Sequence, residues 1–242
     1  MPLDVQRVHR PEGEAGNLQA WARDVRYAAG TRAAGESRAR LAVGHTLSDQ
    51  VETILYRLAV SPGRRALLGM PAESGRLVRP LLAAEVMRTE TAAWCLERGL
   101  AWREDASNLD RAFARSRVRE DLLPALRAVD ERAEANVLRT ARLLADEAAV
   151  LDEVVATALA GRDRLAVTKL AALPPALGRL VLRRLAEDST GRLCARAATR
   201  LDEVLALGDG ALDLGDGARA IVQRGVLRVG RTPGRAPRRG AG

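Results

Sequence analysis

The 242-residue chain is poor in several side chains that binding proteins often use. Aromatic residues make up 2% of it, too few for a base-stacking platform of the kind found in single-strand nucleic-acid binders. Its two cysteines, Cys95 and Cys194, lie far apart without metal-type spacing, so we expect ordinary thiols. No run approaches the roughly 20 apolar residues of a membrane span, and the first residues, MPLDVQRVHR, lack an apolar signal segment. We therefore expect a cytoplasmic protein.

Lysine is also nearly absent, because Lys169 is the only one among 39 basic residues. The formal net charge of +8 predicts an anionic partner, and the planar guanidinium group suits phosphate. A genome with high GC content would also favour arginine together with the abundant Ala, Gly and Leu. The sign of the charge is therefore more informative than the choice of arginine. The hydrophobic content of 47% is enough for one sizeable core or for two to three small ones.

The segment Leu41–Met70 has the pattern of a buried strand, a polar turn and an amphipathic helix. His45, Asp49 and Glu52 lie at or just past the carboxyl end of the predicted strand, where open α/β sheets bind ligands. The two carboxylates are one helical turn apart, so both can face the same way and hold an ammonium group or Mg²⁺. The alternative is a solvated helix start, where acidic residues complement the helix dipole. His45 is either a structural histidine or a general base.

Alternating strands and helices predict an α/β fold with a partial parallel sheet. We expect strands at Leu3–Val8, Leu41–Val43 and Leu77–Arg79, with helices at Gly16–Gly30 and Asp49–Leu58. The remaining chain has mainly helical periodicity. Its expected helices cover residues 85–99, 113–126 with an interruption at Pro124, 130–159, 175–187 and 193–207.

Glycines near the C-terminus predict turns. Gly208–Gly217 alternates glycines with aspartates that would repel phosphate, and a strand-like segment follows it, so we interpret it as turn chemistry and not as a nucleotide loop. A hairpin is expected to turn at Arg224–Gly225.

A second polar block, EDASNLDRAFARSRVR, occupies Glu104–Arg119. The order of GHxxxDQxET at 44–53, RPLL at 79–82, GLxW at 99–102, EDxSNxD and RxRxR resembles the tRNA(Ile)-lysidine synthetase family. GNLQAWARDVRY at 16–27 extends the resemblance, which covers most of the chain. Several motifs in one order are specific, although Ser48, Phe113 and Ser116 replace an acid, a tyrosine and an asparagine of the family pattern.

The resemblance implies a partial parallel sheet of an adenine-nucleotide alpha-hydrolase-like domain, followed by a helical domain and a small C-terminal hairpin. With it, we divide the chain into a truncated PP-loop-type catalytic domain at 1–129 and a helical tRNA-binding region at 130–210. The residue pattern adds a β-hairpin at 211–231 and a flexible tail at 232–242, which lacks apolar periodicity. It also implies an ATP-dependent ligase that uses Mg²⁺. Such an enzyme activates C2 of the wobble cytidine in tRNA(Ile) with a CAU anticodon, and the amine of free lysine then displaces AMP.

By the same resemblance, we expect roles for ten residues. The expected catalytic residues are His45, Asp49 and Glu52. The expected substrate-binding residues are Asp49, Glu52, Asn108, Asp110, Arg115 and Arg117. The expected nucleotide-binding residues are Gly63, Arg64 and Arg65, although only Gly63 and Gly69 remain of the family's glycine-rich loop. No residue is assigned as a metal ligand, and exposed helix arginines paired with Glu104 and Asp105 remain the alternative for the arginine ladder.

The family's SGGxDS phosphate loop does not occur in the sequence. We expect the position of this loop to be upstream of Met1. Either the recorded start is too late, or the chain is a truncated paralogue. A phosphate-binding glycine-rich turn supplies backbone N–H groups and a helix N-terminus, which no other segment offers. A non-catalytic tRNA-binding remnant is therefore the alternative to an active ligase. The sequence leaves open whether two chains form a homodimer.

Overall fold

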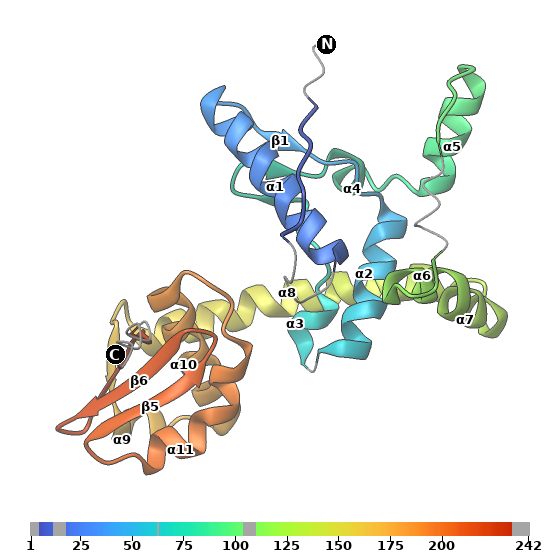
Figure 1. The fold of residues 1–242 in the computed structure, drawn as a ribbon. Coiled ribbons are helices and arrows are strands. Elements are labelled where there is room, and N and C mark those ends of the chain that lie inside the picture. Colours follow the sequence, from blue (N-terminus) through green and yellow to red (C-terminus); the bar gives the residue numbers. More distant parts are fainter. Residues whose placement is uncertain (1–4, 12–17, 62, 104–109, 234–242) are drawn as a thin grey trace. The chain divides into compact units, whose positions relative to one another are not determined.

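A computed structural model describes residues 5–11, 18–61, 63–103 and 110–233 (Figure 1). The chain divides into two compact units, Met1–Ala145 and Asp146–Gly242. The core of each unit contains side chains from that unit alone.

The first unit contains a sheet with the strand order β1-β3-β2. Its strands are β1 (Leu41–Ala42), β2 (Glu73–Ser74) and β3 (Leu77–Val78). Its helices are α1 (Leu18–Glu36), α2 (Leu47–Val60), α3 (Arg64–Leu67), α4 (Pro80–Ala83), α5 (Arg88–Glu97), α6 (Ala114–Arg117), the π-helical η2 (Val118–Leu122), α7 (Leu123–Val129) and α8 (Ala133–Leu159), which continues past the unit boundary.

The parallel pairing predicted for this sheet is confirmed for β1 and β3, whereas β2 runs antiparallel to β3. The strand expected at Leu3–Val8 is wrong over its described part, because residues 5–8 form no strand. Val5 and Val8 are exposed by 70% and 51%. An alternating pattern does not make a strand without a neighbour to pair with.

Helix α2 lies at the centre of the first unit's core. Its residues Val51 and Leu55 pack with Val118, Leu123 and Leu138 from the later helices. The predicted break at Pro124 takes the form of a widened turn, in which the N–H of Leu123 reaches the carbonyl of Val118. The chain therefore passes from α6 to α7 without leaving the helical path, and α6 stays in contact with α2.

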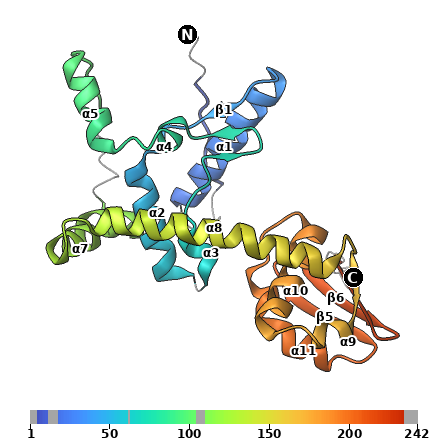
Figure 2. The same cartoon turned by 180° about the vertical axis from the view of Figure 1, so that it is seen from behind.

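The second unit is built on an antiparallel sheet with the order β4-β7-β6-β5. Its strands are β4 (Arg164–Ala166), β5 (Gly210–Gly215), β6 (Ala218–Gln223) and β7 (Val226–Arg231). Its helices are α9 (Val167–Ala171), α10 (Pro175–Thr190), the 3₁₀ helix η3 (Ala195–Arg200) and α11 (Leu201–Ala206). Helix α10 packs against β6 and β7, and Figure 2 shows the unit from behind.

The hairpin predicted at Arg224–Gly225 is confirmed, with φ of 50° and 69° at these two residues as a type I′ turn requires. The interpretation of Gly208–Gly217 as turn was wrong for residues 210–215, which form β5. The helix expected at Leu193–Leu207 starts as 3₁₀ helix at Ala195. Most of the tail, residues 234–242, lies outside the described part.

Candidate functional site

The candidate site lies at the start of α2, directly after β1 and its following turn. Thr46 caps the helix: its hydroxyl accepts from the N–H of Asp49, and the Asp49 carboxylate accepts from the backbone N–H of Thr46 at 2.8 Å. Such a capping box satisfies donors that the first turn of a helix would leave free. The local sequence therefore fixes where the two carboxylates of this turn are presented.

Glu52 is fully buried and is surrounded by three arginines. Arg119 binds it with two hydrogen bonds, from Nε at 2.7 Å and from Nη2 at 3.1 Å. Arg88 Nη2 lies 2.9 Å from its Oε1, and Arg115 Nε lies 3.3 Å from its Oε2. The hydrogen bond with Glu52 raises the pKa of Arg119. Both oxygens of this buried carboxylate are thus occupied by guanidinium groups.

Asp49 is the more accessible carboxylate, with 18% of its side chain exposed. Arg88 lies 3.1 Å from it and Arg115 lies 3.5 Å from it. Burial on its own would raise the pKa of Asp49, but the hydrogen bonds from Thr46 and the charges of both arginines lower it below its usual value. Asp49 is therefore ionised at neutral pH.

His45 lies between β1 and α2. Burial lowers its pKa to about 4; Asp49 opposes this shift, and the charges of Arg23, Arg79 and Arg115 add to it. Its Nδ1 is buried without a hydrogen-bond partner. The imidazole is therefore neutral at pH 7, and positive charge converges on it.

The structure does not bring Arg117 to the two carboxylates. Its guanidinium donates to the backbone carbonyls of Arg111 and Ala112 at 2.8 and 3.1 Å and is exposed. Asp110 is also exposed, and its carboxylate accepts from the N–H of Ala112 at 2.9 Å. Asn108 lies outside the described residues. The predicted roles of these three residues in substrate binding stay predictions.

Gly63, Arg64 and Arg65 open the short helix α3, which packs on α2. Gly63 has a φ of +98°, and Nη1 of Arg64 is buried without a hydrogen-bond partner. A four-residue helix offers little dipole for a phosphate. The predicted role of these residues in nucleotide binding stays a prediction.

Polar side chains anchor the segment that follows α3. Gln50 accepts from the N–H of Met70 at 2.7 Å and donates to its carbonyl at 3.0 Å. Arg57 and Arg79 donate to the carbonyls of Gly69 and Pro71. The segment 69–71 is therefore held to α2 by its backbone.

Sequence reasoning missed Arg88, which joins both carboxylates from the first residue of α5. A cation in the first turn of a helix interacts unfavourably with the helix dipole. The position of Arg88 there was the sequence feature that could have indicated a carboxylate partner. α5 itself buries none of its residues. Arg88 is thus the part of α5 that connects it to the site.

The described residues do not fit a Mg²⁺ ion. Among them, no group of three or more His, Cys, Asp or Glu side chains could hold a metal. The oxygens of Asp49 and Glu52, which would have to bind Mg²⁺, face arginines instead. We assign no step to Mg²⁺.

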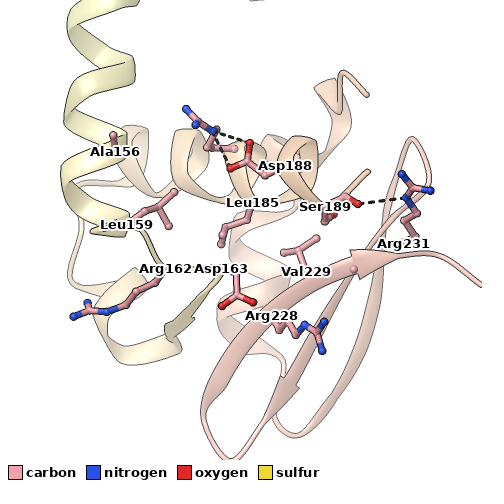
Figure 3. A pocket seen from close by; sticks show the side chains of 13 residues that line it. Ala156, Leu159, Arg162, Asp163, Leu185, Asp188, Ser189, Arg228, Val229 and Arg231 are labelled. Atoms are coloured by element: carbon pink, nitrogen blue, oxygen red, sulfur yellow. Dashed lines mark hydrogen bonds and ion pairs between the residues drawn. The ribbon is translucent and has the colours of Figure 1, made fainter. Parts of the chain in front are cut away.

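A cavity of about 530 Å³ lies within the second unit, between the end of α8, α10 and β7 (Figure 3). The charged residues that line it are Arg162, Asp163, Arg184, Asp188, Arg228 and Arg231. Arg184 pairs with Asp188, and Arg231 donates to the backbone carbonyls at the end of α10. Arginines outnumber aspartates, so the cavity suits an anionic group.

Comparison with known proteins defines the class to which this fold and site belong. A family model of the PP-loop domain matches residues 1–126, so the first unit is of the PP-loop class. The chain is 42% identical over 241 residues to the tRNA(Ile)-lysidine synthase of Salinispora tropica, covering 93% of this chain and 72% of that protein. It is 37% identical over 241 residues to that of Nocardia farcinica, covering 94% and 74%. The chain belongs to the tRNA(Ile)-lysidine synthase family.

The helices of the described residues also bear on membrane insertion. None of them has the length and the apolar character that crossing a membrane requires.

Proposed function

We propose that this chain forms lysidine: it joins lysine to C2 of the wobble cytidine of tRNA(Ile) with a CAU anticodon, using ATP and an adenylated tRNA intermediate. The observation that carries the proposal is the 42% identity with a tRNA(Ile)-lysidine synthase over 93% of the chain. The PP-loop match supports the use of ATP, and the net charge of +8 suits tRNA. The cytoplasm is the proposed compartment.

The second half of this reaction forms a bond between the lysine nitrogen and C2. The bond from C2 to the AMP oxygen breaks, AMP leaves with the electron pair, and the nitrogen loses a proton. We assign the proton to neutral His45. Asp49 binds the α-ammonium group of lysine, since it is ionised and partly exposed. Complete burial of Glu52 does not favour its direct contact with lysine.

Other residues of the first unit are assigned to the larger substrates. The residues assigned to the adenylated tRNA are Asn108, Asp110, Arg115 and Arg117. The residues assigned to the nucleotide are Gly63, Arg64 and Arg65. We derive no step at the ATP phosphates, because the SGGxDS loop is not in this sequence.

We further propose that the helical region 130–210 binds tRNA. Arg162 and Arg184 of this region support the role, since they line the arginine-rich cavity together with Arg228 and Arg231 of β7, and phosphates of an RNA backbone match its charge. A second copy of the chain, as a homodimer, is the remaining proposed partner. A molecular mass of one chain in light scattering would refute the homodimer.

The test uses the gene product that carries this chain, with ATP, labelled lysine and a tRNA(Ile) transcript with the CAU anticodon. We expect one lysine per tRNA at the wobble position by nucleoside mass spectrometry, and none in a transcript whose wobble cytidine is replaced by uridine. Binding of tRNA without lysine incorporation would overturn the ligase and support the binding-only alternative.

The lysine contact is tested by Asp49→Asn, which should raise the KM for lysine by roughly tenfold through loss of a charge-assisted contact. Thr46→Ala is the matched control, because it weakens the same helix cap and keeps the carboxylate. An equal rise of KM in both variants would show that Asp49 acts only through the cap.

A further inference from the structure

Glu52 binds arginines from two parts of the first unit, the start of α5 and the continuous helical path of α6 and η2. Arg88 comes from the start of α5, Arg115 from α6 and Arg119 from η2. All three elements contact α2, and α6 and η2 also contact each other. A single buried carboxylate therefore decides where three guanidinium groups lie relative to one another.

The cluster has more positive charge and more donors than its own carboxylates use. The side chains of Arg88, Arg115 and Arg119 remain exposed by 39%, 33% and 28%. Each guanidinium has five N–H donors, and two carboxylates cannot accept all of them. Nε of Arg115 is buried and lies 3.3 Å from Oε2 of Glu52 as an ion pair, without a hydrogen bond. Counted formally, three guanidinium groups and two carboxylates leave an excess of one positive charge.

We infer that Glu52 is a positioning residue that assembles Arg88, Arg115 and Arg119 into one binding surface for a phosphate monoester, and that Arg88 belongs to this site. The inference rests on the proposed function for the identity of the monoester, which is the AMP that leaves C2. Guanidinium groups that are already held in place bind phosphate oxygens without the entropy loss of bringing them together.

The charge of the surroundings favours a monoester over an RNA phosphodiester. A monoester carries up to two negative charges at neutral pH, whereas a diester carries one. Arg23 and Arg79 add positive potential at His45, next to the cluster. A dianion therefore gains more than a monoanion from the same position.

The first test measures binding of AMP and of inorganic phosphate to the whole chain by calorimetry, without tRNA or lysine. Arg88→Gln should weaken AMP binding by about tenfold, as loss of one charge-assisted contact predicts. Arg98→Gln is the matched control: it removes an arginine at the other end of α5 that stacks on Trp94 at 4.2 Å. Equal effects of both variants would overturn the assignment of Arg88. A dinucleoside monophosphate that binds more tightly than AMP would overturn the monoester.

The second test uses the sign of the effect at Glu52. Glu52→Gln removes a negative charge beside the anion, so simple electrostatics predicts tighter AMP binding. A positioning role predicts weaker binding, because the arginines lose their common acceptor. Glu52→Asp keeps the charge but shortens the side chain, and should also weaken binding. Tighter AMP binding by a folded Glu52→Gln variant would refute the positioning role. If neither Glu52 variant folds, the AMP affinities of Arg88→Gln and Arg98→Gln decide whether the arginine cluster binds the monoester.

NMR titration of His45 gives a readout that a purely structural role would not move. AMP bound at the arginines should raise the pKa of His45 above about 4, since its charge offsets theirs. The chain has two histidines, so a His45→Asn variant assigns the signals. An unchanged pKa with bound AMP would place the anion elsewhere. AMP binding as predicted, together with no lysine incorporation, would refute the proposed function and leave this site intact.

Discussion

Replacing Gly69 by alanine tests how the segment after α3 is held to α2. Gly69 has a φ of +68°, and an added Cβ would lie 2.5 Å from Nε2 of Gln50. The left-handed backbone costs an alanine about 1 kcal/mol. Displacing Gln50 breaks two hydrogen bonds to buried backbone of Met70, a further loss of about 2 kcal/mol. We expect Gly69→Ala to lower the free energy of unfolding by about 3 kcal/mol.

Gly75→Ala is the matched control. Gly75 has a φ of +58° in the same unit, but an added Cβ would meet no atom within 4 Å. This variant should lose only about 1 kcal/mol. All three tryptophans of the chain lie in the first unit, so their fluorescence during urea unfolding reports on that unit.

A double variant isolates the contact. In a Gln50→Ala background the obstructing side chain is gone, so Gly69→Ala should cost no more than Gly75→Ala. Equal losses for Gly69→Ala and Gly75→Ala in the natural background would refute the reasoning. The anchoring matters for the proposed function because the segment 69–71 follows the end of α3, the helix that carries Arg64 and Arg65.

Three further outcomes are expected. Between pH 6.5 and 4 the unfolded chain binds a proton at His45 that the folded chain does not, so the natural protein loses stability as the pH falls, and His45→Asn should flatten this dependence. Partial exposure reduces the effect to about 1–2 kcal/mol. An unchanged pH dependence in urea titrations would contradict it. Thr46→Ala should lower the free energy of unfolding by about 1 kcal/mol through loss of the helix cap, and Thr46→Ser by much less. Equal losses for both variants in tryptophan-monitored unfolding would show that the cap does not stabilise the helix. Gly225→Ala should destabilise the second unit by about 1 kcal/mol, as measured by circular dichroism, without changing the unfolding transition seen by tryptophan fluorescence. A shift of the fluorescence transition would show that the two units do not unfold independently.

Local sequence was enough to predict the strand, turn and helix around Asp49. Helical spacing of apolar residues predicted a helix at Asp49–Leu58, and in the structure α2 covers Leu47–Val60. The hairpin at Arg224–Gly225 was predictable for the same reason. Features encoded in short windows do not depend on the rest of the fold.

Contacts across long sequence separations were not predictable. Arg88 reaches Asp49 over 39 residues and Arg119 reaches Glu52 over 67. The family resemblance assigned Arg117 to the site and not Arg119, because a motif does not say which face of α6 and η2 meets α2. Gly210–Gly215 has a composition with low strand propensity, and pairing with β6 overrides it.

The edges of the second unit's sheet affect how copies of the protein behave at high concentration. β4 is only three residues long, and β5 is irregular between Asp213 and Gly215. Short and bulged edges are poor templates for strands from another molecule. This sheet is therefore protected against intermolecular stacking and amyloid-like growth, even though its inner strands β6 and β7 are regular.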